Sequence, residues 1–475
     1  MWHIYHKSRA TLRCLVTIRA KYVQCDGQKN RQRSHLTSLR TVVAEHIVPE
    51  SPSVPSARTV LTAASIFIVA HLLLLIGVSA PDKFYFDEVH YVPAARQMLE
   101  PVMREPMLNP MHPPLAKQLI AASIKVFGDN PFGWRYPAAL FGALALVGVY
   151  LGGLALFARQ SSAIAATLIA AFNQMLFVQS RIAMLDIFSL AFSLFAIAAF
   201  AYGFRQARPH LYFALAGIAS GLAAACKWSG LFVLATCIAV VAVIRLMQGW
   251  RTQFADARPE DWYRPDLWPF FRPHHFAACF VLLPAIVYLA SFVPLYGFSF
   301  ADIIEAQRRI FADNTTTAIA GHTYMSSWPS WPFLVRPVWY LFDKLDGDSI
   351  AAVVLLGNPL ILWPALAALA LALRDWIIVR RADAFLVLAF YFGPYLAWAL
   401  LPRTLGFIYY YLPAATAASF ALVYALTRGG APRWLLWAFV TVGALGFAAM
   451  LPISAACIGT SMANFNRLML FQNWI

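Results

Sequence analysis

Charged residues are scarce in this sequence. Only 12% of its 475 residues are Asp, Glu, Lys or Arg, whereas 60% are hydrophobic. A soluble domain usually carries about 25% charged residues, so this composition excludes an ordinary water-soluble protein and a disordered chain. Cysteine is scarce too. The six cysteines form no Cys-x-x-Cys pair and several lie in apolar runs, which argues against a disulfide framework and a structural zinc site.

The net charge of +15 does not indicate nucleic-acid binding. Roughly ten Lys and Arg residues precede residue 59, against Asp26, Glu45 and Glu50, and the other basic residues are scattered between apolar runs. Such a distribution orients a membrane protein. Residues 1–57 are polar and basic, and we expect a disordered tail or an over-extended gene start. Residues 58–475 form the predicted membrane domain.

Long apolar runs predict about eleven membrane-spanning helices. A spanning helix needs about 20 mainly apolar residues, and the runs therefore predict an all-α integral membrane protein. The first run could also be a signal peptide that ends at Ala80, but Pro81 and the long preceding segment favour an uncleaved anchor. The predicted spans are 58–80, 136–157, 161–178, 184–204, 210–226, 229–247, 274–296, 349–372, 382–401, 405–427 and 433–456.

The connections between these spans predict the orientation. With a cytoplasmic N-terminus, the inner connections hold most of the Lys and Arg residues, and the short outer turns hold about one each. This is a positive-inside pattern. Two long loops, 81–135 and 297–348, then lie outside the cytoplasm. Loops beyond about 15 residues tend to carry function, so we expect the active or binding site there.

Two adjacent carboxylates, Asp87 and Glu88, follow the first predicted span within a few residues. A carboxylate beside low-dielectric surroundings has a raised proton affinity and can take the proton of a hydroxyl group. The pair is therefore a candidate for the general base of an enzyme. Another interpretation stays open, because Asp is also a preferred N-cap residue and Asp87 precedes a predicted helix over 88–99.

Four basic residues lie at the predicted outer membrane face, where the positive-inside rule disfavours them. Ionisable groups beside spans are costly and usually have a partner, and a guanidinium group fits phosphate oxygens well. They indicate an anionic partner such as a lipid phosphate. A snorkelling arginine and a structural pair between Arg181 and Asp186 remain alternatives. The four residues are Arg135, Arg181, Lys227 and Arg403.

Both long loops hold further candidates. His112 precedes two prolines, which restrict its backbone and can start a surface helix. His112 and Lys117 either shape this entry or face a polar headgroup. The second loop carries His322, Trp328 and Trp331 among many aromatic residues. Aromatic residues are common at membrane interfaces, and these would also suit the faces of a sugar.

Taken in order, these segments resemble the protein O-mannosyltransferase family, in its bacterial form (glycosyltransferase family 39). The likeness covers about residues 60–475. The combination is much more specific than any one motif. The matching stretches are FDEVHY (86–91), HPPLAK (112–117), FGDNPFGWRYPAALFG (127–142), QSRIAMLD (179–186), CKWSGL (226–231), SSWPSWPFLVRPVWY (326–340) and YYLPA (410–414).

The resemblance implies a multi-span helical fold of the GT-C type and a reaction. Mannose would pass, with inversion, from a polyprenyl-phosphate donor to Ser or Thr hydroxyls of secreted or translocating proteins, outside the cell or inner membrane. No cofactor or metal is implied. By position, Asp87 would be the base, Glu88 an acceptor-positioning partner and Arg135 a phosphate ligand. Further donor-phosphate ligands would be Arg181, Lys227 and Arg403, and weaker candidates for the donor or acceptor site are His112, Lys117, Asp186, His322, Trp328 and Trp331.

Three positions depart from the family's pattern, and two other functions stay open. Ala116, Thr323 and Tyr410 stand where the family usually has Gly, Pro and His. These changes leave the chemistry plausible and put the acceptor in question. A related GT-C enzyme could glycosylate lipid A or another glycan. A transporter of anionic solutes would be a different class, but its charged residues should lie near the membrane midplane.

Overall fold

The computed structural model describes residues 56–475, except 101–106, 250–260, 264–266, 317–320 and 402–405. The predicted tail 1–57 lies outside the described residues apart from its last two. The α-helices are α3 (Ala57–Leu75), α4 (Glu88–Gln97), α5 (Leu115–Phe127), α6 (Pro131–Phe157), α7 (Gln160–Ala171), α8 (Gln174–Gln179), α9 (Asp186–Phe204), α10 (His210–Cys226), α11 (Leu231–Gly249), α12 (Pro273–Ala277), α13 (Leu283–Ala290), α14 (Val293–Tyr296), α15 (Phe300–Thr316), α16 (Pro359–Arg374), α17 (Ala382–Leu400), α18 (Leu412–Thr427), α19 (Arg433–Met450) and α20 (Met462–Leu468).

The predicted helical membrane architecture is confirmed. Nine helical segments of the described residues are long and apolar enough to cross a membrane, and two shorter apolar helices, α7 and α10, coincide with further predicted runs. The chain is therefore a multi-pass membrane protein. The exact number of crossings stays a prediction, because α7 and α10 are shorter than the about 20 residues that a straight span needs.

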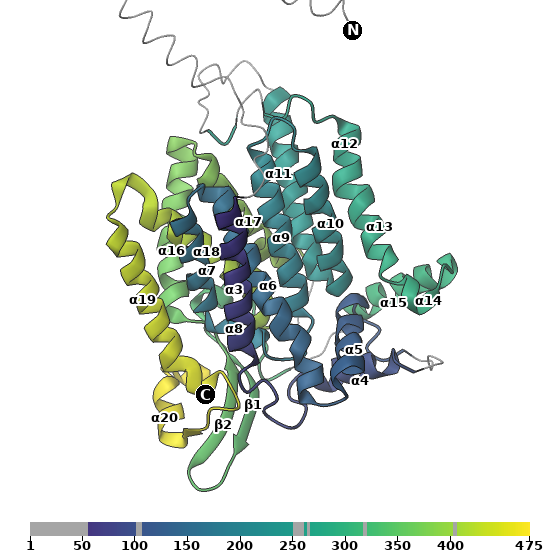
Figure 1. The fold of residues 1–475 in the computed structure, drawn as a ribbon, viewed down its shortest axis with the longest axis vertical. Helices are drawn as coiled ribbons and strands as arrows, with labels where there is room; N and C mark the ends of the chain where they lie inside the picture. Colours follow the sequence, from purple (N-terminus) through teal and green to yellow (C-terminus); the bar gives the residue numbers. More distant parts are fainter. Residues whose placement is uncertain (1–55, 101–106, 250–260, 264–266, 317–320, 402–405) are drawn as a thin grey trace, which may run out of the picture. The chain divides into compact units, whose positions relative to one another are not determined.

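Helix α9 packs against both α6 and α10 at the centre of the bundle (Figure 1), and α18 packs between α16, α17 and α7. Small residues let these helices approach closely, as is usual in membranes. A Cβ atom added at Gly148 of α6 would lie 2.7 Å from the Cβ atom of Leu194 in α9. Both α3 and α19 lie at the edge and expose more of their apolar side chains, as helices that face lipid do.

One predicted span is partly wrong. The first seven residues of the run 349–372 form strand β2 (Ser349–Leu355), and helix α16 begins only at Pro359. Short apolar runs do not distinguish strand from helix. Strand β2 pairs antiparallel with β1 (Val338–Lys344) and with the short β3 (Thr460–Ser461). The second long loop therefore ends in a β-hairpin that an all-helical prediction missed.

The two long loops lie at the same end of the bundle (Figure 1). Lys83 of the first loop pairs with Asp343 of the hairpin at 2.8 Å, and Asn314 of α15 donates a hydrogen bond to the carbonyl of Met111 at 2.8 Å. Helix α6 starts at this end, and Arg205 donates to the Leu156 carbonyl near its other end. The loops thus form one assembly at the start of α6.

Candidate active site

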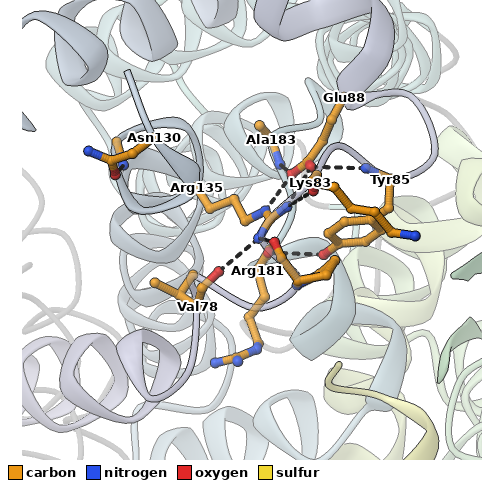
Figure 2. Close-up of polar contacts among 10 residues, drawn as sticks. Val78, Lys83, Tyr85, Glu88, Asn130, Arg135, Arg181 and Ala183 are labelled. Carbon is orange, nitrogen blue, oxygen red and sulfur yellow. Dashed lines mark hydrogen bonds and ion pairs between the residues drawn. The ribbon is translucent and has the colours of Figure 1, made fainter. Parts of the chain in front are cut away.

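A buried ion pair joins the first loop to helix α6 (Figure 2). Arg135 Nε donates to Glu88 Oε1 at 2.8 Å, and Arg135 Nη2 donates to Glu88 Oε2 at 2.9 Å. Both side chains are fully buried. Glu88 also accepts the backbone N–H groups of Tyr85 and Ala183. Its two oxygens therefore have partners on three segments of the chain.

Arg135 uses all five of its N–H donors within the protein. Besides the two bonds to Glu88, its Nη1 donates to the carbonyls of Val78 and Pro81, and its Nη2 to the carbonyl of Lys83. A guanidinium group has five N–H donors. No donor remains for a phosphate while these bonds hold. The arrangement instead holds residues 78–88 against the start of α6.

Asp87 directly precedes the residue fixed by this ion pair. Asp87 stands at the N-cap position of α4, as the capping interpretation expected, but its side chain makes no capping hydrogen bond. The preceding residue, Phe86, has a φ of 50°, a region that costs energy for a residue other than glycine. Its ring stacks on Tyr340 with centroids 4.0 Å apart. Strand β1 and the buried ion pair thus hold the residues on both sides of Asp87.

The surroundings of Asp87 favour a proton acceptor. The side chain is half-buried. Burial raises the pKa of Asp87 above its ordinary value, while the nearby Lys227, His90 and His322 lower it and Asp186 raises it further. A carboxylate with a raised pKa is a stronger base than one in water. Residues from the first loop, from the helical bundle and from the second loop therefore lie around one carboxylate.

Lys227 and Asp186 form the second buried pair. Lys227 Nζ lies 2.8 Å from both carboxylate oxygens of Asp186, and the two side chains are nearly buried. Asp186 is the first residue of α9 and Lys227 follows the last residue of α10. Each charge is thus favourable for the dipole of its own helix. The alternative pair between Arg181 and Asp186 does not form.

Aromatic rings surround the Lys227 ammonium group. Its Nζ lies 5.4 Å from the ring centroid of Tyr409 and 5.1 Å from that of Tyr410, a distance at which cation–π attraction acts. Tyr410 stacks on Trp398 at 4.4 Å. Trp331 of the second loop contacts both of these rings. We call the rings of Tyr409, Tyr410 and Trp398 the ring layer. Trp331, one of the predicted site residues, is buried and supports this layer.

Other second-loop candidates line the same region. His322 is exposed and packs edge-on against Phe407, and its charge acts on Asp87. Trp328 is half-buried against Tyr395, whose hydroxyl donates to the Trp328 carbonyl at 3.1 Å. The structure therefore brings His322 near the carboxylate and leaves Trp328 at the side of the ring layer.

The residues of the His112 motif and the following helix α5 pack against α4. Helix α5 starts at Leu115, directly after the two prolines, as expected. The His112 ring lies 6.0 Å from that of Tyr91. Lys117 is buried, and its Nζ donates to the carbonyls of Asn109 and His112. Burial lowers the pKa of Lys117 to about 7. Its role here is to close the loop.

Of the last two basic candidates, Arg181 does not join this cluster. Arg181 accepts a hydrogen bond from Tyr85 through its carbonyl, but its guanidinium group reaches the Leu74 carbonyl and Cys457 instead. Arg403 lies outside the described residues. Within the part of the chain that the structure describes, no three His, Cys, Asp or Glu side chains gather as metal ligands would.

Sequence reasoning missed three functional neighbours, Phe86, Tyr340 and Tyr409. Tyr340 contributes the ring under Phe86, and its hydroxyl accepts a hydrogen bond from Gln179 at 2.9 Å. The sequence contains a weak signal for them, since Phe86 and Tyr340 lie inside the matched stretches 86–91 and 326–340 and Tyr409 directly precedes 410–414. Only the structure shows that these stretches share one face.

Two family models match the chain. "Dolichyl-phosphate-mannose-protein mannosyltransferase" matches residues 125–295, and "C-terminal four TMM region of protein-O-mannosyltransferase" matches residues 299–474. Among curated proteins, the chain is similar to the polyprenol-phosphate-mannose–protein mannosyltransferase of Mycolicibacterium smegmatis strain ATCC 700084, with 31% identity over 391 residues, 68% of this chain and 73% of that protein. The protein of the same name from Mycobacterium tuberculosis strain H37Rv is 30% identical over 409 residues, 71% and 74% of the two chains.

Solved structures have the same fold. The protein O-mannosyltransferase complex Pmt1–Pmt2 of Saccharomyces cerevisiae, bound to its sugar donor, contains a chain that matches with a TM-score of 0.72 and 15% identity, covering 89% of this chain and 93% of that one. ArnT of Cupriavidus metallidurans matches with a TM-score of 0.52 and 16% identity, covering 83% and 64%. From the family models, the curated relatives and this fold, we conclude that the chain belongs to the protein O-mannosyltransferase family, a family of GT-C membrane glycosyltransferases.

Proposed function

We propose that this enzyme transfers mannose from a polyprenyl-phosphate-linked donor to Ser or Thr hydroxyl groups of secreted or translocating proteins. Family membership supports the reaction class, and the names of the curated relatives support the donor and a protein acceptor. Family membership also argues against the transporter alternative. The observation that carries the proposal is the Asp87 carboxylate, which makes no capping hydrogen bond to α4 and interacts with the charge of the buried Lys227.

Asp87 is the proposed general base. It takes the proton of the acceptor hydroxyl as the hydroxyl oxygen forms a bond to the anomeric carbon of mannose. The bond from that carbon to the phosphate oxygen breaks in the same displacement, so the configuration inverts. The electron pair of the broken bond leaves with the polyprenyl phosphate. A phosphate leaves as an anion and does not need a proton donor. Positive charge beside it stabilises the negative charge that develops.

Lys227 is the proposed source of that charge. The ammonium group is held by Asp186 and lies against the Tyr409 and Tyr410 rings. Arg135 has all its donors occupied, so we assign it and Glu88 to positioning Asp87 and not to the donor phosphate. His322 and Trp328 are proposed to face the sugar or the acceptor, and Arg403 remains a proposed phosphate ligand.

The membrane orientation is part of the proposal. The Lys and Arg residues of the predicted inner connections favour a cytoplasmic N-terminus. Residues 81–135 and 297–348 then lie outside the cytoplasm, on the outer face of the cell or inner membrane, where translocated acceptors emerge.

The first prediction is loss of transfer in Asp87→Asn. Membranes that contain the full chain receive radiolabelled polyprenyl-phosphate-mannose and a Ser/Thr-rich peptide. We expect the rate to fall by roughly 10²–10⁴-fold, the usual contribution of a general base. Asp346→Asn, at the exposed tip of the hairpin, is the control and keeps the rate. Wild-type rates in Asp87→Asn would refute the base assignment, and label found only in lipid would point to a glycolipid acceptor.

The second prediction concerns pH. The base works only when deprotonated, so kcat/KM rises with pH through the pKa of Asp87. Since burial raises that pKa, the acid limb should lie above the ordinary carboxyl value of about 4. His90→Gln removes a side chain whose charge lowers the pKa of Asp87, and it leaves Lys227, His322 and Asp186 in place. The acid limb of the pH profile should therefore move to higher pH. His274→Gln, an exposed residue of α12, should leave it unmoved, and a shift there of the same size counts against the assignment.

The third prediction separates the two buried cations. Lys227→Met should lower kcat/KM for the donor by roughly 10²–10³-fold, as for removal of one transition-state donor, and Lys227→Arg should recover part of it. Arg135→Met should chiefly lower stability, by about 3–5 kcal/mol, because it leaves the Glu88 charge buried alone. Thermal unfolding and donor kinetics of each purified variant distinguish the two. Lys125→Met, on the exposed side of α5, is the neutral control.

The fourth prediction is that transfer is independent of metal. Since Lys227 supplies the positive charge for the leaving phosphate, a chelator such as EDTA should leave the transfer rate unchanged. Added Mg²⁺ or Mn²⁺ should not raise it. A loss of activity with EDTA that either ion restores would show that a metal takes this role.

A further inference from the structure

A large apolar groove, separate from the residues around Asp87, opens beside helix α3. Its volume is about 810 Å³, within the range of about 300–1,000 Å³ that is usual for small-molecule sites. Neither Asp87 nor Lys227 lines it. Helices α3, α7, α8 and α19 form its walls, with side chains that include Val69, Leu73, Leu168, Phe172 and Phe447.

One end of this groove is charged. Arg181 lines it, nearly buried, with its guanidinium group 5.2 Å from the ring centroid of Phe177. Its Nη1 donates to the Leu74 carbonyl at 2.6 Å, and its Nη2 contacts Cys457 Sγ at 3.7 Å. Among the described residues, no carboxylate pairs with it. Arg135, in contrast, uses all five donors and has a carboxylate partner. Arg181 therefore has donors and charge left over.

The dimensions of the groove match one leaflet of a bilayer. On α3 its lining runs from Ser65 to beyond Leu74, about 15 Å at the rise of about 1.5 Å per residue. This is half of the about 30 Å hydrocarbon core. Arg181 lies at the loop end of the groove, where α3 finishes, which is the depth of lipid headgroups.

We propose that this groove binds one anionic phospholipid of the leaflet on the side of the two long loops. The phosphate accepts hydrogen bonds from Arg181, and an acyl chain fills the space between α3 and α19. Charge complementarity favours this occupant, because a buried cation without a carboxylate is costly unless an anion joins it. A polyprenyl chain, which is longer than one leaflet, would extend beyond the groove.

The bound lipid would act on the candidate site through the backbone. The Arg181 carbonyl accepts the Tyr85 hydroxyl at 3.2 Å, and Ala183, two residues further, donates to Glu88 at 3.0 Å. Lipid at Arg181 would therefore steady the same loop that holds Asp87. It would also cover α3, which otherwise has few buried side chains. The proposal does not depend on which sugar or acceptor the enzyme uses.

Cys457 provides a direct measurement. Its thiol is exposed in the groove beside Arg181, whereas Cys226, Cys237 and Cys279 are buried. In a full-length Cys14→Ser, Cys25→Ser background, the delipidated protein is mixed with phosphatidylglycerol, phosphatidylcholine or undecaprenyl phosphate. The rate of maleimide labelling of Cys457 and the lipid retained in native mass spectrometry are measured. We expect one phosphatidylglycerol per chain and at least tenfold slower labelling, with little effect of phosphatidylcholine.

Matched variants test the geometry. Val69→Trp fills the groove and should abolish lipid retention, whereas Ile68→Trp should keep it. Both residues are about half exposed on α3, at 57% and 54%, but only Val69 lines the groove. Arg181→Gln should lose the preference for phosphatidylglycerol, and Arg181→Lys should keep part of it. If Arg181→Gln fails to fold, the Val69 and Ile68 pair still decides.

Four outcomes would overturn the proposal. Preferential retention of undecaprenyl phosphate would assign the groove to the donor lipid. Equal retention of phosphatidylcholine would remove the role of Arg181. Protection of Cys457 that depends on protein concentration would indicate a second copy of the chain. No protection by any lipid would show an empty groove. None of these readouts requires transfer activity, so they are distinct from a failure of the proposed function.

Discussion

The buried ion pair between Glu88 and Arg135 is the constraint on which the candidate site depends. Two charges at the end of a membrane helix are tolerated only when every hydrogen-bonding group has a partner. Here Arg135 binds Glu88 and three carbonyls of residues 78–83, so the loop after α3 has little freedom. Asp87 cannot form the same bonds because its neighbour Glu88 already makes them. Its side chain makes no capping hydrogen bond to α4, and its carboxylate interacts with the charge of Lys227.

The second pair, Lys227 with Asp186, solves a different problem. For the role that we propose for Lys227, its ammonium group has to be kept charged in a poorly hydrated place. The ends of α9 and α10 provide this, since the helix dipoles favour Asp186 at one helix start and Lys227 at the other helix end. The rings of Tyr409 and Tyr410 add attraction without a hydrogen bond. The ammonium group can then approach an incoming anion without losing its supports.

The sequence was sufficient to predict the helices, but it did not show which charged side chains pair with each other. Apolar runs mark membrane helices because lipid excludes polar side chains, and each of the eleven runs contains helix. The run 161–178 is divided between α7 and α8, however, and the start of 349–372 is a strand. The charged residues were identified as candidates, but their partners lie 41 and 47 residues away, where no spacing rule applies. Arg135 was therefore expected to bind phosphate, yet its donors are occupied, while Lys227 is the cation beside Asp87. The side of the membrane, the acceptor and Arg403 stay predictions.

Arg181 and Arg135 show how the same residue type near the same loop can have different partners. Both were expected at the donor phosphate, and both lie near Tyr85. Arg135 is neutralised by a carboxylate within the chain, whereas the guanidinium group of Arg181 meets only a carbonyl, a thiol and a ring among the described residues. An unpaired cation at the end of an apolar groove is stable when the membrane supplies the anion. A membrane enzyme can thus use lipid as a structural partner at one arginine while its own carboxylate serves the other.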